Sequence, residues 1–273
     1  MPPLKLMAVL AHPDDESLGF GGTLAKYASE GVDVSVVTAT RGDAGRYRGH
    51  PPGHEAHPGA QALAAIREGE LRAAAAVLGV RELLLLDYHD QQLDSAPPQD
   101  VIDGIARHIR RIRPDVVLTF GPEGAYGHPD HIAVSQFATA AIVTAAGHTH
   151  ERDPGSPPHV VSKLYYLAWP APAWAAFESA FRRLISTVDG QERQATPWPE
   201  WALTTVIDTR AFWPRVWEAI SCHLSQVTAY ERLRDLSPEH HEALWGWQSF
   251  YRVFSTVNGG RGRETDLFEG IQR

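Results

Sequence analysis

Cysteine is nearly absent from this sequence, which restricts how the fold can be stabilised. Cys222 is the only cysteine among 273 residues, so the chain can form no internal disulfide, and a reducing, cytoplasmic location suits it. Long apolar runs are missing as well, because no stretch approaches the ~18 residues that a transmembrane helix needs. The few apolar residues after Lys5 are too short for a signal peptide. We therefore expect a cytoplasmic protein without membrane insertion.

Positive charge is also scarce. The chain has 25 Lys and Arg against 33 Asp and Glu, a formal net charge of -8. Phosphate binding needs a basic surface, and the one short basic run, residues 107–113, has helical spacing with Ile109 and Ile112. We expect a solvated helix face there, and no nucleic-acid partner.

The sequence does contain a regular alternation of apolar runs and helical segments. Residues 4–11 and 32–40 are typical of buried strands, and residues 18–29 between them are typical of a helix that stops at Gly31. Strand, helix and strand within ~35 residues form a βαβ unit, in which the strands are parallel and the crossover is right-handed. The same alternation predicts strands at 83–86, 116–120 and 160–168, and helices at 61–78, 100–112 and 129–146.

These elements predict one α/β domain, a Rossmann-like, mostly parallel sheet with helices on both faces. Residues 1–168 form its core, and residues 169–273 are an extension of the same domain. Residues 41–60 are a long loop with three histidines, which we expect to be exposed rather than metal-bound. The Pro- and Trp-rich stretch after Trp169 is expected to be irregular and to cover the site. Later elements are expected at 204–208, 212–225, 238–245 and 251–257.

Two polar motifs each follow a predicted strand. Residues 11–16 read AHPDDE after the first strand, and residues 126–131 read YGHPDH after the strand at 116–120. The carboxyl ends of parallel strands meet at one edge of a sheet, where open α/β folds bind their ligands. Each motif is a weak signal alone. Together, at the ends of two strands, they predict one site.

The residue types in these motifs suit a catalytic zinc, which takes about three protein ligands and keeps one position open. His12 and Asp15 are spaced i, i+3, as are His128 and His131. Three of these four side chains suffice as ligands, which leaves one histidine for work on a proton or an oxyanion. Asp14 is then available as a general base.

The second motif offers further donors. Tyr126 and His128 are placed to form an oxyanion site opposite the metal, and Asp130 is expected to orient His128 through its ring N–H. Fe²⁺ is an alternative to Zn²⁺ in the cell, since both accept histidine and carboxylate ligands.

The two motifs together resemble the PIG-L/LmbE family of zinc-dependent N-acetylglucosaminide deacetylases. The resemblance extends to segments 40–42 (TRG), 67–70 (REGE) and 78–80 (LGV). Residues 223–226 (HLSQ) resemble a late family segment, and residues 264–267 (ETDL) resemble the tail of the family's mycothiol-pathway members.

This resemblance implies roles for the motif residues. It implies that His12, Asp15 and His131 bind zinc and that Asp14 is the general base. It also implies that His128 is an acid or oxyanion stabiliser, with a mobile second donor in the tyrosine two positions before it, Tyr126.

The resemblance also implies substrate contacts. Arg67 would bind sugar hydroxyls, although its helix also carries Glu68 and Glu70, and pattern alone places it on a solvated face. Counting from the segment at 78–80 puts Asp94 where the mycothiol-pathway members contact substrate, with Asp90 as a competitor for that role. Arg41 is a further candidate for substrate binding, typical of the wider family.

The function that we expect is zinc-dependent hydrolysis of an N-acetyl group from an amino sugar or its glycoside, a small-molecule substrate. One alternative is an amidase for a thiol-sugar conjugate or another bulky acyl amide. A second is a Rossmann-type nucleotide-binding protein, which Gly19, Gly21 and Gly22 support poorly because they lack the G-x-G-x-x-G spacing. The aglycone is open, and a homo-oligomer is compatible with the sequence.

Overall fold

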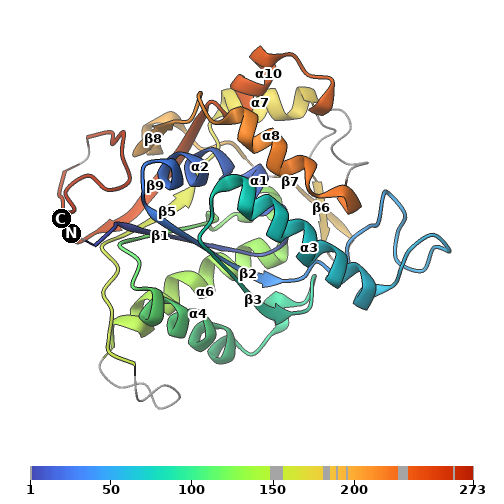
Figure 1. Ribbon diagram of the computed structural model, residues 1–273, viewed down its shortest axis with the longest axis horizontal. Helices are drawn as coiled ribbons and strands as arrows, with labels where there is room; N and C mark the ends of the chain where they lie inside the picture. Colours follow the sequence, from blue (N-terminus) through green and yellow to red (C-terminus); the bar gives the residue numbers. More distant parts are fainter. Residues whose placement is uncertain are drawn as a thin grey trace.

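The computed structural model describes residues 2–147, 156–180, 185–188, 190–194, 196–226, 233–260 and 262–272. A seven-stranded sheet runs through the middle of the molecule, and helices cover both of its faces (Figure 1). The Rossmann-like α/β class predicted from the sequence is confirmed.

The sheet has the strand order β3-β2-β1-β4-β5-β9-β8. The chain runs outward from β1 through β2 to β3, and then returns to place β4 on the other side of β1. The carboxyl ends of β1 and β4 therefore flank the point where the strand order reverses, the usual ligand position in such folds. The five parallel strands are β1 Lys5–Leu10, β2 Asp33–Thr40, β3 Glu82–Tyr88, β4 Val116–Thr119 and β5 Lys163–Leu167.

The last third of the chain adds two strands to the same sheet. β9 (Trp247–Ser255) pairs antiparallel with β5, and β8 (Thr205–Asp208) pairs antiparallel with β9. A separate two-stranded sheet is formed by β6 (Ile185–Val188) and β7 (Gln191–Gln194).

Helices form a layer on each side of the sheet (Figure 1). α2 (Gly21–Ser29) and α3 (Ala60–Leu78) lie on one side with α8 (Trp213–Ser221). α4 (Pro98–Ile112) and α6 (Pro129–Ala146) lie on the other. This division follows from the right-handed crossover rule, because the connections on the two sides of β1 run in opposite directions.

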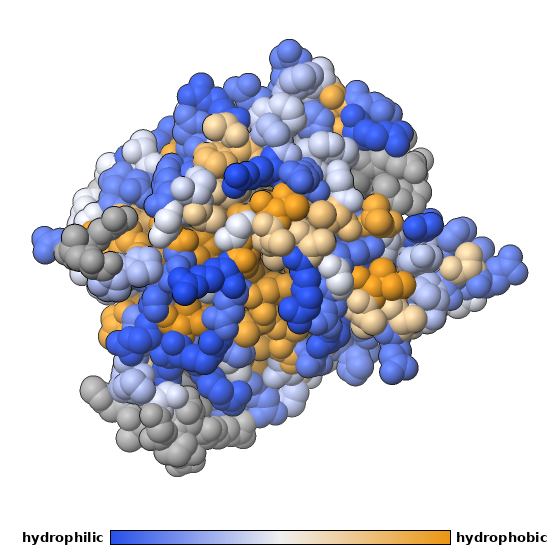
Figure 2. Space-filling model, in the orientation of Figure 1, coloured by the Kyte–Doolittle hydropathy of each residue, from blue (hydrophilic) through white to orange (hydrophobic). Residues whose placement is uncertain are grey.

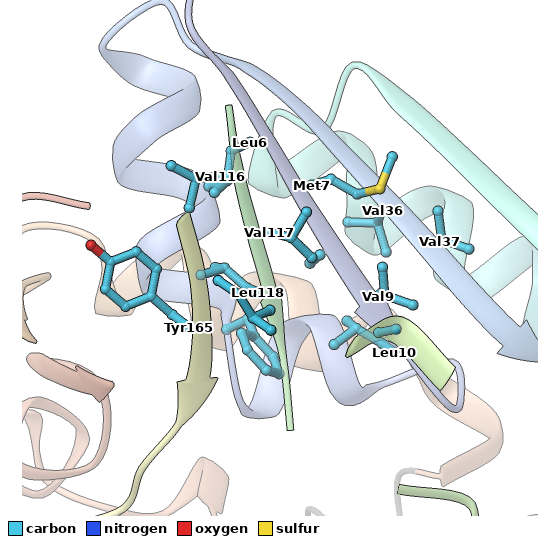
Figure 3. Close-up of a cluster of buried hydrophobic side chains, with 14 of the residues drawn as sticks. Leu6, Met7, Val9, Leu10, Val36, Val37, Val116, Val117, Leu118 and Tyr165 are labelled. Atoms are coloured by element: carbon cyan, nitrogen blue, oxygen red, sulfur yellow. The ribbon is translucent and has the colours of Figure 1, made fainter. Parts of the chain in front are cut away.

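Continuous apolar strands form the core between these layers. The side chains from Leu6 to Ala11 are all 0% exposed, as expected for a strand that is covered on both faces (Figure 3). α4 is amphipathic instead: it buries Val101, Ile105, Ile109 and Ile112, which recur every three or four residues on one face.

Two predicted segments differ in the structure. The helix expected at 18–29 is two helices, because α1 (Asp15–Leu18) ends before α2 begins. The stretch after Trp169 is not irregular throughout, since it contains α7 (Ala171–Ala180) and the β6–β7 hairpin. Pro172 obscured α7 in the sequence, although proline is well tolerated in the first turn of a helix.

The remaining elements are short or lie near the predicted positions, although β9 begins four residues before the strand expected at 251–257 and α8 ends four residues before the end of the helix expected at 212–225. Residues 41–60 contain only an isolated bridge between Tyr47 and His50 outside α3, so the long loop is confirmed. Residues 148–155, in the connection expected before the fifth strand, lie outside the described residues. The other elements are α5 Gly124–Gly127, α10 Pro238–Trp245 and the 3-10 turns Leu93–Ser95, Glu200–Ala202 and Leu224–Gln226.

Among the described residues, no helix is both long and apolar enough to cross a bilayer. On the face drawn in Figure 2, hydrophilic residues cover the rim and hydrophobic residues gather toward the middle.

A buried carboxylate fixes the tail of the chain to the sheet. Glu264, only 2% exposed, accepts hydrogen bonds from Lys163 at 2.8 Å, Arg252 at 2.7 Å and Tyr165 at 2.8 Å. Burial alone would raise the pKa of Glu264, but its hydrogen-bond donors lower it to about 2. The carboxylate therefore stays ionised between two cations, near the amino end of β5.

We predict that Glu264→Gln destabilises the fold by about 3 kcal/mol at pH 7, because it leaves Lys163 and Arg252 buried without their anion. The lowered pKa means that the full contribution is present above pH 4.5 and is lost as the pH falls toward 2. Urea denaturation should therefore separate variant and wild type clearly at pH 7 and much less near pH 2. The control is Glu55→Gln, in an exposed loop, and an equal effect of both substitutions would contradict the prediction.

Candidate active site

A polar cavity of about 170 Å³ lies at the carboxyl ends of β1 and β4 and opens to solvent. Its lining comes from six separate stretches of the chain and combines both sequence motifs. The residues that line it are His12, Asp14, Asp15, Gly45, Arg67, Asp90, Gln91, Tyr126, His128 and Gln226.

The three predicted metal ligands lie close together, and two of them, His12 and Asp15, line this cavity. His12 Nδ1 lies 3.1 Å from His131 Nε2. The carboxylate of Asp15 lies 3.3 Å from His131 Nε2 and 3.8 Å from His12 Nδ1. The backbone N–H groups of Ala11 and His12 hold this carboxylate at 3.1 and 2.8 Å. Two imidazoles and one carboxylate in this arrangement match the donor set of a catalytic zinc.

The orientation of His12 supports metal binding through Nδ1. Its other nitrogen, Nε2, lies 3.0 Å from Asp130 Oδ2 and 3.0 Å from Asp90 Oδ1. Burial alone would lower the pKa of His12, but these two carboxylates raise it to about 10. Both carboxylates face Nε2, so Nδ1 is the nitrogen that lies toward Asp15 and His131, and a metal bound there would take the place of the Nδ1 proton. Carboxylates commonly hold metal-binding histidines in this way.

Asp130 therefore lies against a different histidine from the one that we expected. Its carboxylate bonds His12 and the backbone N–H groups of Gln91 at 2.7 Å and Leu93 at 3.1 Å. Only its backbone N–H reaches His128, at Nδ1, 3.2 Å away. The cause is geometric: His128 is the N-cap of α6, so its ring turns back onto the backbone N–H of Asp130 instead of the Asp130 side chain.

His128 is a neutral hydrogen-bond donor in this environment. Burial and the neighbouring charges of His12 and His131 lower its pKa to about 4. Because Nδ1 accepts the Asp130 N–H, the remaining proton is on Nε2. The nitrogens of His12, His128 and His131 also lie within 4.8 Å of one another, so these three histidines are a second possible ligand set.

Asp14 has a strained backbone next to the predicted metal ligands. Its φ of 117° and ψ of -23° are rare for a residue with a side chain, and such conformations cost on the order of 1–3 kcal/mol. Glu16 Oε2 accepts the Asp14 N–H at 2.9 Å, and Arg67 Nη2 lies 3.1 Å from Asp14 Oδ2. Strain of this kind, held by specific bonds, is typical of functional sites.

Arg67 lies on the buried face of α3, not on its polar face. It is 4% exposed, and its guanidinium also donates to the carbonyl oxygens of Pro13 and Gly42. Gly42 has φ +66°, and a Cβ there would lie 2.1 Å from Arg67 Nη1. A glycine at this position is therefore what lets the arginine reach Asp14.

Tyr126 lies on an irregular turn above the histidines. Its ring packs edge-on against His128 and His131, at centroid distances of 5.8 and 5.2 Å. Burial and nearby carboxylates raise its pKa, so its hydroxyl keeps its proton. The preceding Ala125 has φ 62° and ψ -66°, so the short helix α5 is broken at this point.

Two predicted substrate residues do not line the cavity. Asp94 is exposed in the turn after β3, whereas Asp90, its competitor, lines the cavity and bonds His12. Arg41 pairs with Glu68 and Asp87 instead. The structure thus places Asp90, not Asp94, beside Arg67.

Sequence reasoning missed three residues that line the cavity: Gly45, Gln91 and Gln226. Gln91 follows the carboxyl end of β3, so the strand-end rule could have found it. Gln226 is brought in from the far end of the chain by hydrogen bonds, its Nε2 to the Arg46 carbonyl oxygen at 2.8 Å. Only the resemblance of residues 223–226 to a late family segment pointed to it.

Comparison with known proteins identifies the family of this chain. The family profile "PIG-L: GlcNAc-PI de-N-acetylase" matches residues 7–142, which include both motifs. The chain is 36% identical over 291 residues to a 1D-myo-inositol 2-acetamido-2-deoxy-alpha-D-glucopyranoside deacetylase of Rhodococcus jostii, with 98% of each chain covered.

Solved structures share the fold. N,N'-diacetylchitobiose deacetylase from Pyrococcus horikoshii has a TM-score of 0.67 and 22% identity, covering 91% of this chain and 83% of its own. GalB, the 4-carboxy-2-hydroxymuconate hydratase of Pseudomonas putida, has a TM-score of 0.68 and 19% identity, covering 94% and 99%. Because a hydratase and a deacetylase share this fold, the fold alone does not fix the chemistry. The full-length identity to the Rhodococcus enzyme does show the family: the chain belongs to the PIG-L family of deacetylases.

Proposed function

We propose that this protein is a zinc-dependent deacetylase that removes the acetyl group from an N-acetylglucosamine glycoside of inositol. The observation that carries the proposal is the convergence of His12 Nδ1, His131 Nε2 and the Asp15 carboxylate beside Asp14. The Rhodococcus relative, named for an acetamido sugar linked to inositol, supports the choice of substrate.

The zinc ligands in this proposal are His12, Asp15 and His131. Bound there, zinc would supply a Lewis acid that polarises the amide carbonyl and lowers the pKa of water to about 7. His128 is the less suitable ligand, because its Nδ1 is occupied by the Asp130 N–H and its Nε2 carries the proton.

Asp14 is the proton acceptor. Its carboxylate lines the cavity next to the proposed ligands, and Arg67 stabilises its negative charge at 3.1 Å. Asp14 takes a proton from the water that attacks the amide carbon, and then delivers a proton to the amine nitrogen as the C–N bond breaks. A single carboxylate can serve both steps because its protonation state alternates between them.

His128 and Tyr126 stabilise the developing oxyanion. Both line the cavity, and both keep a proton to donate, since the pKa of His128 is lowered to about 4 and that of Tyr126 is raised. His128 thus acts through a neutral Nε2–H donor rather than as an imidazolium acid. Donors fixed before the reaction stabilise the charge without reorganising.

The polar lining suits a polyhydroxylated substrate. Arg67, Asp90, Gln91 and Gln226 offer both donors and acceptors around the mouth of the proposed metal site. Hydroxyl groups of a sugar and of inositol can form hydrogen bonds with these groups, whereas a long acyl chain cannot.

The decisive experiment is free-amine release by the zinc-loaded chain from a panel of acetamido sugars: N-acetylglucosamine, its inositol and malate glycosides, and chitobiose. We expect release from the inositol glycoside with the highest kcat/KM. A preference for bulky acyl amides over acetyl would favour the thiol-conjugate amidase instead. Silence on every acetamido sugar and acyl amide, with zinc bound, would contradict the proposed function.

We predict that His131→Ala loses zinc, whereas His128→Ala keeps it and loses turnover. The first substitution removes one of three converging ligands, and the second removes only an oxyanion donor. Elemental analysis of both purified variants measures the stoichiometry. Zinc loss in His128→Ala with full occupancy in His131→Ala would show that the ligand set is wrong.

We predict that Asp14→Asn retains zinc but lowers kcat by about 10²–10⁴-fold, the usual range for losing a general base. The amide keeps the shape of the side chain and cannot take the proton. Steady-state kinetics on the preferred glycoside measures the change, with exposed Asp94→Asn as the control for a neighbouring surface charge. Wild-type turnover in Asp14→Asn would remove this residue from the role of base.

A further inference from the structure

A buried hydrogen-bonded pair lies behind the cavity and takes no part in the chemistry above. His223 Nε2 is 2.8 Å from Glu16 Oε1, and both side chains are fully buried. The two residues are 207 positions apart: Glu16 lies in α1, and His223 follows α8. Neither lines the cavity, so neither can touch a substrate there.

The second oxygen of Glu16 leads to the proposed base. Glu16 Oε2 accepts the backbone N–H of Asp14 at 2.9 Å, while Ser17 Oγ donates to Oε1 at 2.5 Å. Asp14 has the left-handed φ of 117°, which persists only while its surroundings hold it. The hydrogen bond from the Asp14 N–H to Glu16 is therefore one of the contacts that maintain this backbone conformation.

His223 in turn holds the Glu16 carboxylate. A buried carboxylate is unfavourable unless it is hydrogen-bonded, so loss of His223 would let Glu16 rotate toward another partner. That rotation would withdraw Oε2 from the Asp14 amide. The ring of His223 is presented by a fixed segment, since Ser225 bonds the Glu70 carboxylate on α3 through its backbone N–H and its hydroxyl, both at 2.6 Å.

We propose that His223 is a positioning residue for the deacetylation: through Glu16 it holds the backbone of Asp14, and so directs the Asp14 carboxylate into the cavity. The proposal rests on the proposed function of Asp14 as the proton acceptor. Because His223 acts on the base and not on the substrate, its loss should lower kcat and leave KM nearly unchanged.

The test compares two substitutions in the zinc-loaded, full-length chain. His223→Leu removes the donor, and we expect kcat to fall about 10- to 100-fold, since small misplacements of catalytic groups cost this much. KM should stay within about twofold, as expected when only a transition-state interaction is lost. His223→Gln offers an amide N–H to Glu16 and should restore most of kcat. If His223→Leu does not fold, His223→Phe removes the donor while keeping a planar ring.

The control is a second buried histidine with a different environment. His241 is 4% exposed and packs among Trp213, Trp217 and Trp245, away from the cavity lining. His241→Leu should lower the melting temperature without changing kcat. A purely structural role for His223 predicts that the two leucine variants behave alike.

Hydrogen exchange at the Asp14 amide gives a readout that needs no turnover. We expect faster exchange of this amide in His223→Leu, and wild-type exchange in His223→Gln and His241→Leu. Wild-type kcat in His223→Leu, or equal losses in the leucine and glutamine variants, would overturn the positioning role. If the wild-type chain deacetylates no glycoside, the proposed function fails separately, and unchanged Asp14 exchange in His223→Leu would still overturn the positioning.

Discussion

The adjacency of β1 and β4 is the constraint on which the site depends. His12 follows β1 and His131 lies just beyond β4, 119 residues later, yet their ring nitrogens are 3.1 Å apart. Parallel pairing of Leu6 with Val116 and Ala8 with Leu118 aligns the ends of the two strands. The register of two buried, apolar strands therefore sets the distance between the two imidazoles, and a slip by one residue would separate them.

Charge compensation accounts for most of the surrounding architecture. Burying His12 and the nearby acids is tolerable only because each one has a partner: Asp130 and Asp90 on His12, and His223 on Glu16. The same logic applies at the other end of the sheet, where Glu264 lies between two cations. In each case the partner comes from a distant part of the chain, so these contacts also join the segments of the fold.

The sequence was informative wherever local pattern decides structure. Apart from the short helices α1 and α5, the strand and helix positions through α6 followed from apolar periodicity, and the strand-end rule brought the two motifs together. Prediction from the sequence failed where the direction of a side chain depends on tertiary contacts. The sequence pattern placed Arg67 on a solvated face, but the missing side chain of Gly42 leaves space for it in the interior. Asp130 bonds His12 because Nδ1 of His128 already accepts the Asp130 backbone N–H. Asp90 faces the cavity and Asp94 faces solvent, and the sequence pattern after β3 does not indicate which of the two faces the site.

The contact between Glu16 and His223 has a consequence for the order of events during synthesis. Both histidine motifs leave the ribosome long before residue 223, so a nascent chain can pair β1 with β4 while Glu16 still lacks its partner. Contacts of such large sequence separation form late, after the loop-closure entropy of the whole chain has been overcome. We therefore expect the loop that carries Asp14 to acquire its final geometry only after residue 223 has joined the fold, so that folding of the last third and maturation of the site coincide.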